Sequence, residues 1–313
     1  MAAPIVVFAF NRPGHLKRSL EALAGNDLAL ESALTVFCDG PRSEEEKEKT
    51  DAVRKLCRSI SGFKSVTLVE RDENLGCDPS VSSGLQEFFG VHSEGIVVED
   101  DIVFSPNALR WFNTCLERFR DEPAVFSIAG WSFPGKHLPI PSDYPYDAYF
   151  LPRFLGWGWA SWADRIKRID WTLADYETFI ETPLLVKAFM RGGADLPDLL
   201  KVQRRKGEMD TWDIQAAYAA FKHGQLSLAP RFPYATNIGT SGEGTHIRPD
   251  LGYHPAHIDL SLALDVPLLP GHVVADERIL KSFRKALRIL QPSFGLRLAR
   301  RMKRILSQGG KVA

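Results

Sequence analysis

The sequence of 313 residues has no long apolar run, no CxxC pair and, from Lys281 onward, no acidic side chain. Its four cysteines are scattered, which is typical of reduced cysteines in a cytosolic protein. No apolar segment reaches the roughly 20 residues that cross a bilayer, so we expect no spanning helix. Residues 1–4 carry no basic stretch ahead of the first apolar residues, so we expect no secretion signal. These absences predict a cytoplasmic protein.

Positive charge gathers at the C-terminal end. The formal net charge is zero, yet ten Lys and Arg lie from Lys281 onward, so the preceding part carries about ten net negative charges. Over residues 281–306 these cations alternate with apolar residues at helical intervals. A basic amphipathic helix is typical of peripheral contact with an anionic membrane, here the inner face of the cell membrane, while a solvated charged terminus is the alternative. The acidic remainder argues against a nucleic-acid partner.

Alternating periodicities predict the fold of the first hundred residues. Apolar runs alternate with stretches of helical spacing: the runs cover residues 4–10, 34–38, 66–69 and 96–98, and the helical stretches cover residues 15–24, 43–59 and 80–89. Ser43, with Glu46 three residues on, is typical of a helix start with a capping box. Strand–helix alternation predicts an α/β protein with a mostly parallel, Rossmann-like sheet and helices on both faces.

Polar residues follow three of these predicted strands. Asn11 and Arg12 follow the first, Asp39 follows the second, and the acidic run from Glu99 to Asp101 follows the fourth. Ligands of such sheets bind beyond the carboxyl ends of the strands. We therefore expect these side chains to converge on one edge of the sheet.

The run Glu99-Asp100-Asp101 is the strongest chemical signal. Neighbouring like charges repel and shift one another's pKa unless a cation lies among them. Carboxylate oxygens are the ligands that Mg²⁺ and Mn²⁺ prefer, and Mg²⁺ usually keeps positions for substrate phosphates. A solvated acidic turn is the alternative, but the apolar residues on both sides favour a metal site.

The second half carries less regular signals. Trp157 and Trp159 alternate with glycines, which favours a loop whose indole rings stack on a sugar or base, although burial in a core is the alternative. Asp210 and Asp213 lie at the start of an Ala-rich predicted helix, and simple N-capping is the alternative explanation for either acid. His246, in a polar loop, is either a metal ligand or an ordinary loop histidine.

Residues 4–115 resemble nucleotide-sugar glycosyltransferases of the GT-A fold. Glu99-Asp100-Asp101 is similar to the E-D-D variant of their metal-binding D-x-D motif. The likeness is greatest to the N-acetylglucosaminyltransferase I group and its bacterial relatives, in which one strand ends in Cys-Asn-Arg and another in Gln-Asp. Asn11-Arg12 and Asp39 match those strand ends, although Cys38 stands where that group has Gln.

The resemblance implies roles for the residues at the strand ends. Asp101 is the expected ligand of Mn²⁺ or Mg²⁺, and Glu99 and Asp100 are expected to contact the ribose and the donor sugar. Arg12, with Asn11 beside it, is expected to bind the diphosphate through paired hydrogen bonds. Asp39 is expected to accept a hydrogen bond from the imide N–H of uracil, which favours a UDP-sugar donor.

Further roles are expected on the acceptor side. Asp213 is the expected general base, with Asp210 as its rival, and an inverting reaction follows from that arrangement. Trp157 and Trp159 are expected to line the acceptor site, and His246 to bind the metal or the diphosphate.

The predicted organisation is one GT-A domain over residues 1–276, followed by a basic helical tail over residues 277–313. Within the domain, residues 1–115 are expected to bind the nucleotide sugar and residues 116–276 the acceptor, a glycan or a lipid-linked molecule. A nucleotidyltransferase of related architecture is one alternative, although the chain offers no Gly-rich phosphate loop with a lysine near its start. A non-catalytic carbohydrate-binding protein on the same fold is the other.

Overall fold

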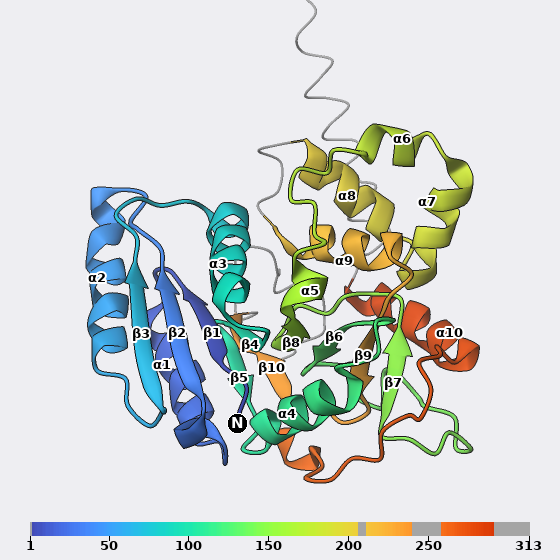
Figure 1. The fold of residues 1–313 in the computed structure, drawn as a ribbon, viewed down its shortest axis with the longest axis horizontal. Helices are drawn as coiled ribbons and strands as arrows, with labels where there is room; N and C mark the ends of the chain where they lie inside the picture. The colour runs from blue at the N-terminus through green and yellow to red at the C-terminus, as the bar shows by residue number, and fades with distance from the viewer. Residues whose placement is uncertain (1, 206–210, 240–257, 291–313) are drawn as a thin grey trace, which may run out of the picture.

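The computed structural model describes residues 2–205, 211–239 and 258–290, apart from the side chains of residues 289 and 290. A sheet of eight strands crosses the molecule (Figure 1) in the order β3-β2-β1-β4-β8-β6-β9-β7, and β5 and β10 form a separate antiparallel pair. The strands are β1 (Ile5–Ala9), β2 (Ala33–Cys38), β3 (Ser65–Glu70), β4 (Glu94–Glu99), β5 (Ile102–Phe104), β6 (Val125–Ala129), β7 (Ala148–Leu151), β8 (Trp159–Trp162), β9 (Leu226–Pro230) and β10 (Ala235–Asn237).

Helices cover both faces of this sheet, which confirms the predicted α/β class. They are α1 (Pro13–Ala24), α2 (Glu44–Arg58), α3 (Cys77–Val91), α4 (Ala108–Phe119), α5 (Ala163–Ile166), α6 (Tyr176–Ile180), α7 (Pro183–Phe189), α8 (Leu196–Arg204), α9 (Asp213–Lys222) and α10 (Glu277–Ala286). No described helix is long and apolar enough to span a membrane.

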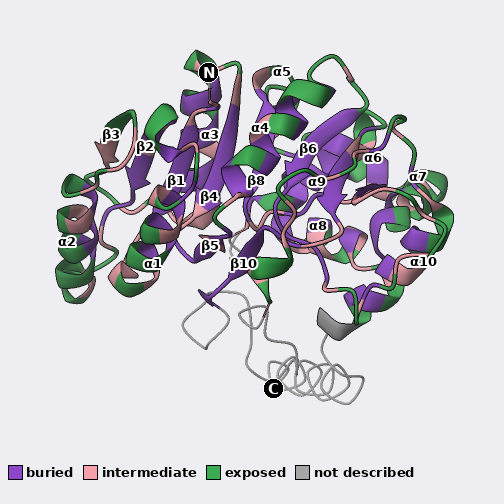
Figure 2. Ribbon diagram, turned by 90° about the horizontal axis from the view of Figure 1, so that it is seen from below, coloured by how far each residue is buried: buried purple, intermediate pink, exposed green. Residues whose placement is uncertain are grey.

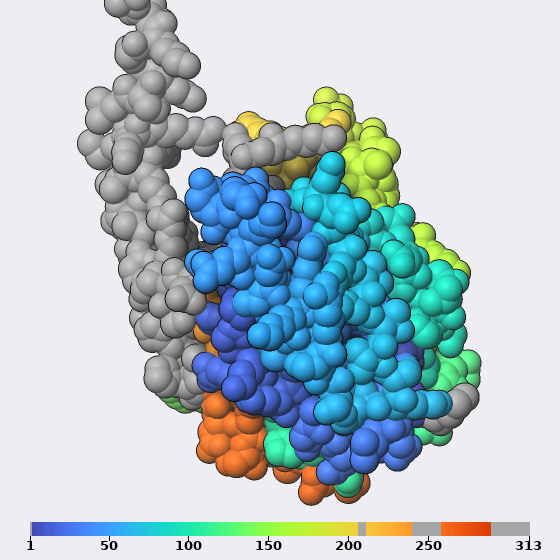
Figure 3. Space-filling view, turned by 90° about the vertical axis from the view of Figure 1, so that its left-hand side faces the viewer, coloured from blue at the N-terminus to red at the C-terminus, as the bar shows by residue number. Residues whose placement is uncertain are grey.

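The first four strands in chain order are parallel where they pair. β1 lies between β2 and β4, with Ala9 opposite Cys38 and Phe8 opposite Glu99. The β-branched residues of these strands suit a pleated sheet that is buried on both faces. β3 forms the outer edge of the sheet beside α2, and N-terminal residues make up this side of the molecule (Figure 3).

The second half of the sheet is mixed. β8 is antiparallel to both of its neighbours, β4 and β6, whereas β9 is parallel to β6 and antiparallel to β7. β8 therefore joins a strand of the first hundred residues to the strands that follow residue 124.

Two apolar clusters, one on each face, form the core, and the central strands are buried (Figure 2). Alternate residues of β1 divide between the clusters: Val7 joins α1, α2 and α4 on one face, and Phe8 joins α3 and the helices from α5 to α9 on the other. The first cluster also contains Ile279 and Phe283 of α10. The core therefore continues past residue 276, where the sequence predicted the globular domain to end.

One local prediction holds in part. Ser43 is the N-cap residue of α2, as predicted, but it makes no capping hydrogen bond through its side chain. The carboxylate of Glu46, the expected partner in a capping box, accepts a hydrogen bond of 3.3 Å from the backbone N–H of Arg42 and one of 3.0 Å from the side-chain amide of Asn11. Glu46 therefore links the start of α2 to the turn that follows β1.

Candidate functional site

The parallel pairing of β1, β2 and β4 brings the polar residues that follow these strands to one edge of the sheet. Arg12 begins the turn into α1, Asp39 follows β2, and Glu99 ends β4 with Asp100 and Asp101 directly after it. Because parallel strands point the same way, all these residues lie at the carboxyl edge.

Arg12 binds two of the acids with one guanidinium. Its Nη1 donates to Asp101 Oδ2 at 2.9 Å, and its Nε donates to Asp100 Oδ2 at 3.3 Å. Its Nη2 also donates to Asp100 Oδ1. Burial alone would lower the pKa of Arg12, but the charges of Asp100 and Asp101 outweigh that effect and raise it. Arg12 is therefore a fixed, charged bridge between consecutive aspartates.

The pair β5 and β10 holds Asp101 from the other side. Asn237 Nδ2 donates to Asp101 Oδ1 at 3.3 Å, and the backbone N–H of Ile238 donates to the Asp101 carbonyl at 2.8 Å. A Cβ atom on Gly239 would lie only 2.2 Å from Asp101 Oδ2, so a residue with a side chain does not fit there without a shift. Asn237 and Gly239 were not predicted as site residues, although they belong to the same polar stretch of sequence as His246.

Glu99 completes the acidic group and has no hydrogen-bond partner for its carboxylate in the part of the chain that the structure describes. Burial, followed by the charges of Asp101 and Asp100, raises the pKa of Glu99 well above its usual range. The charge of Asp213 contributes least among these causes, in the same direction.

These acids fit a divalent cation in charge and in ligand type. Three carboxylates beside one guanidinium leave an excess of negative charge, and carboxylate oxygens are preferred ligands of Mg²⁺ and Mn²⁺. No group of three or more His, Cys, Asp or Glu within the described ranges is arranged to hold a metal on its own. An ion held by Asp101 would have water or substrate phosphates among its ligands, as is usual for Mg²⁺.

Asp213 is the first residue of α9 and is exposed. The N-cap residue is Trp212, and Asp213 follows it in the first turn, where a negative charge favours the helix start. Asp213 Oδ1 accepts a hydrogen bond of 2.5 Å from the Thr211 hydroxyl. The rival base, Asp210, and the predicted metal ligand His246 both lie outside the described residues.

A glycine-rich turn ahead of β8 lies between the acidic strand end and α9. A Cβ on Gly156 would lie 3.7 Å from the Cβ of Asp213. Gly158 has φ +68°, and a Cβ there would lie 2.4 Å from Cε1 of Phe104 in β5. The turn thus contacts both sides of the site, and Gly158 allows the close approach to β5.

The two tryptophans of this turn have different surroundings. Trp157 is half-buried and packs against Trp131, with ring centroids 4.6 Å apart. Trp159 is only 1% exposed and packs between Phe154 and Trp212 in the core. The prediction that Trp159 lines the acceptor site was therefore wrong, because its indole has no open face for a ligand.

Asp39 also differs from its predicted role. It is 4% exposed, and its carboxylate accepts hydrogen bonds from the backbone N–H groups of Gly40 and Leu75 and from Asn74 Nδ2. Burial raises its pKa, while these backbone hydrogen bonds act in the opposite direction. The carboxylate thus fixes the loop before α3 and is not free to accept a hydrogen bond from the imide N–H of uracil.

A basic pocket of about 580 Å³ lies beside Arg12, at the start of α1. It is lined by Asn11, Arg12, Pro13, Gly14, His15, Arg18 and Lys49. Arg18 and Lys49 are exposed, and neither forms an ion pair with any residue that the structure describes. These two cations belong to no sequence motif, since they come from different helices and meet only in the fold. A pocket with this lining suits an anionic group such as phosphate.

No protein-family model matches the chain. Among solved structures, it is similar to TarS from S. aureus, with 13% identity and a TM-score of 0.41 over 75% of this chain and 36% of that one. A shorter form of TarS, residues 1–349, gives 11% identity and a TM-score of 0.41, covering 74% of this chain and 59% of that one. The chain thus spans about a third to three fifths of the TarS chains that it matches.

A third similar structure is the mannosyltransferase PcManGT from Pyrobaculum calidifontis, in complex with GDP-Man and Mn²⁺. It has 14% identity and a TM-score of 0.39, over 70% of this chain and 74% of that one. Likeness at this level does not establish a family. The functional conclusion therefore depends on the site itself.

Proposed function

We propose that the protein is a glycosyltransferase that moves a hexosyl or N-acetylhexosaminyl group from a nucleotide diphosphate donor to a hydroxyl of a glycan or lipid-linked acceptor. One observation carries the proposal: Glu99, Asp100 and Asp101 lie at the carboxyl edge of parallel strands, and Arg12, which lines a basic pocket, donates hydrogen bonds to two of them. Such a site combines acids that suit a divalent cation with a basic pocket that suits a diphosphate.

The donor diphosphate would lie against Arg12 and the basic pocket. The guanidinium of Arg12 has more N–H groups than its three hydrogen bonds to the aspartates use. Arg18 and Lys49 would add positive charge without first breaking an ion pair with a described residue. Asp101 would hold Mn²⁺ or Mg²⁺, which when bound neutralises negative charge on the leaving diphosphate.

The acceptor would enter from the side of α9 and Trp157. Asp213 would accept the proton of the attacking hydroxyl, since its carboxylate is exposed and the turn that packs against it also packs against Phe104 of β5. Attack from the face opposite the leaving diphosphate inverts the anomeric carbon. UDP stays the proposed nucleotide on the sequence resemblance, with any contact to uracil made by the loop that Asp39 holds rather than by its carboxylate.

A screen of nucleotide sugars tests the proposal. UDP- and GDP-sugars are incubated with the full chain, with Mn²⁺ or Mg²⁺ or with EDTA, and released nucleoside diphosphate and thermal melting are followed. We expect one donor to be hydrolysed slowly and to raise the melting temperature only when metal is present. Asp101→Asn should abolish the metal-dependent part of both signals.

Donor affinity offers a matched comparison on α1 and α2. Arg18→Ala and Lys49→Ala should each raise the KM for the donor several-fold, because each removes a cation from the pocket. Lys17→Ala is the control, since Lys17 is next to Arg18 but pairs with Glu21 and does not line the pocket. Absence of release and stabilisation with every donor would favour the non-catalytic alternative, and pyrophosphate release from a nucleoside triphosphate would favour the nucleotidyltransferase.

A further inference from the structure

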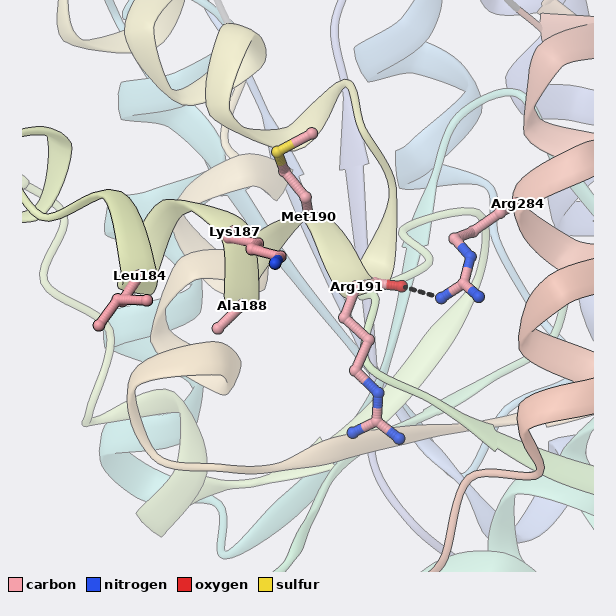
Figure 4. Close-up of a pocket in the computed structure, with 6 residues that line it drawn as sticks. All are labelled: Leu184, Lys187, Ala188, Met190, Arg191 and Arg284. Carbon is pink, nitrogen blue, oxygen red and sulfur yellow. Dashed lines mark hydrogen bonds between the residues drawn. The ribbon is translucent and has the colours of Figure 1, made fainter.

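A second surface, far from the acids in the sequence, combines exposed apolar side chains with cations. It is formed by α7, by the 3₁₀ turn η2 (Met190–Gly192) that follows it, and by α10 (Figure 4). Leu184, Leu185 and Met190 are 79%, 45% and 39% exposed. A pocket of about 550 Å³ on this surface is lined by Leu184, Lys187, Ala188, Met190, Arg191 and Arg284.

Two contacts join η2 to α10. Arg284 Nη1 of α10 donates to the carbonyl oxygen of Arg191 at 3.4 Å, the interaction drawn in Figure 4. Arg191 Nη2 also pairs with Glu277 Oε1 at 2.5 Å. The apolar and basic side chains of this surface therefore belong to one continuous patch, which we call the α7–α10 face.

Positive charge dominates this face. Lys187 and Arg284 form no ion pair with an acid in the described ranges. α10 directs its apolar side chains, including Phe283, into the core, so that Lys281 and Lys285 are exposed on its outer side. Glu277 offsets part of this positive charge, since its carboxylate forms an ion pair with Arg191.

The occupant of the face can be chosen on charge. Residues 291–313, which follow directly after α10 and its last turn, contain six Lys and Arg and no acid. Covering the face with this segment would place like charges together, so the segment is a poor occupant. An anionic partner would be attracted by the positive charge of the α7–α10 face and also by that of residues 291–313.

The leucines distinguish between anionic partners. Nucleic acid is bound mainly by cations at its phosphates, and exposed Leu184 and Leu185 would gain little from it. A bilayer with anionic headgroups offers phosphates for cations and an apolar boundary for leucines. We propose that the α7–α10 face docks on an anionic lipid bilayer, with Leu184 and Leu185 entering the headgroup boundary while Lys187 and Arg284 contact lipid phosphates.

This inference extends the membrane contact predicted for residues 281–306 to α7, and it holds whether or not the transferase proposal is correct. Its test measures lipid binding and not transfer. The full chain is sedimented with vesicles of phosphatidylcholine alone and with vesicles in which about a third of the lipid is phosphatidylserine. We expect at least tenfold more binding to the anionic vesicles, falling steeply as salt is raised.

Three variants separate the face from the basic C-terminal segment. The double change Leu184→Asp with Leu185→Asp, and separately Lys187→Glu, should each lower binding at least fivefold at unchanged melting temperature. Val91→Asp is the matched control, because Val91 is 80% exposed on α3 and carries the same kind of change elsewhere. Its binding should equal that of the natural chain.

Three results would overturn the proposal. Equal binding to neutral and anionic vesicles would remove the role of charge. Unchanged binding by both face variants would assign the contact to the C-terminal segment alone. Loss of a dimer rather than of lipid binding in Leu184→Asp with Leu185→Asp, seen by analytical ultracentrifugation, would assign the face to a second copy of the chain.

Discussion

Arg12 bridges Asp100 and Asp101, two nearly buried carboxylates whose mutual repulsion would otherwise be costly. The side chain of Asp100 is 4% exposed and that of Arg12 20% exposed, so water screens their interaction only in part. The bridge therefore acts on stability as well as on any ligand.

A double-mutant cycle measures this coupling. Arg12→Ala leaves Asp100 buried beside two other acids, and we expect it to lower the free energy of unfolding by about 3–5 kcal/mol, the usual cost of a broken buried pair. The additional change Asp100→Asn should recover part of that loss in urea unfolding. Arg58→Ala is the control, because its pair with Glu70 is exposed and little effect is expected. Strictly additive effects of the two changes would show that the bridge contributes no coupling.

The identity of the base is a second question for single residues. Asp213→Asn keeps the shape of the side chain and removes its ability to take a proton. We expect turnover to fall by about 10²–10⁴-fold with donor-induced thermal stabilisation unchanged. Asp210→Asn should keep near-normal turnover. The reverse pattern would assign the base to Asp210.

Residue identity predicted chemistry better than it predicted exposure. The acidic run and Arg12 were found from the sequence because their place after short apolar runs fixes them at strand ends. Trp159 and Asp39 were misjudged, because tertiary packing decides whether an indole face or a carboxylate oxygen stays available. Arg18 and Lys49 left no local signal at all.

At the scale of elements, the turn from Gly156 to Gly158 positions one side of the site against the other. Gly158 meets Phe104, three residues beyond Asp101, and Gly156 meets Asp213. The spacing between the acids and the predicted base therefore depends on how closely this turn packs on β5.

A change at Gly158 tests that dependence. Gly158→Ala adds a methyl at φ +68° that would lie 2.4 Å from Phe104 Cε1. Left-handed backbone and overpacking together should lower the free energy of unfolding by about 2 kcal/mol or more in chemical denaturation. Any transferase activity should fall further than stability alone explains. Gly135→Ala is the control, since no atom lies within 4 Å of its added methyl; an equal effect of both changes would contradict the argument.

Elements with strict periodicity were predicted well, and those held by long-range contacts were not. The predicted runs 34–38 and 96–98 lie within β2 and β4, and the run 4–10 contains β1, because β-branched residues between turns admit few other structures. The apolar residues of α10 have the spacing that is also typical of a helix lying on a membrane surface. The same spacing instead packs Ile279 and Phe283 into the core, which periodicity alone cannot distinguish.

For the whole molecule, α10 decides where the chain can be shortened. A chain that ends after Asp276 loses Ile279, Leu280, Phe283 and Leu287, all buried. At about 1.5–3 kcal/mol for each side chain, the loss of about 6–12 kcal/mol matches the entire stability of a typical domain. We expect the chain that ends after Asp276 to show no cooperative thermal transition. A chain that ends after Leu290 should melt close to the full chain, and equal melting of both would show that α10 is dispensable.

The place of β8 has a consequence for how this protein can be taken apart. β8 (residues 159–162) lies between β4 and β6. The strand next to β4, in the half of the chain that contains the acids, therefore comes from the half that contains Asp213. Neither portion has a complete sheet alone. Grafting a foreign acceptor half onto residues 1–115 would therefore have to supply a matching strand in the same register, or leave an apolar edge open to aggregation.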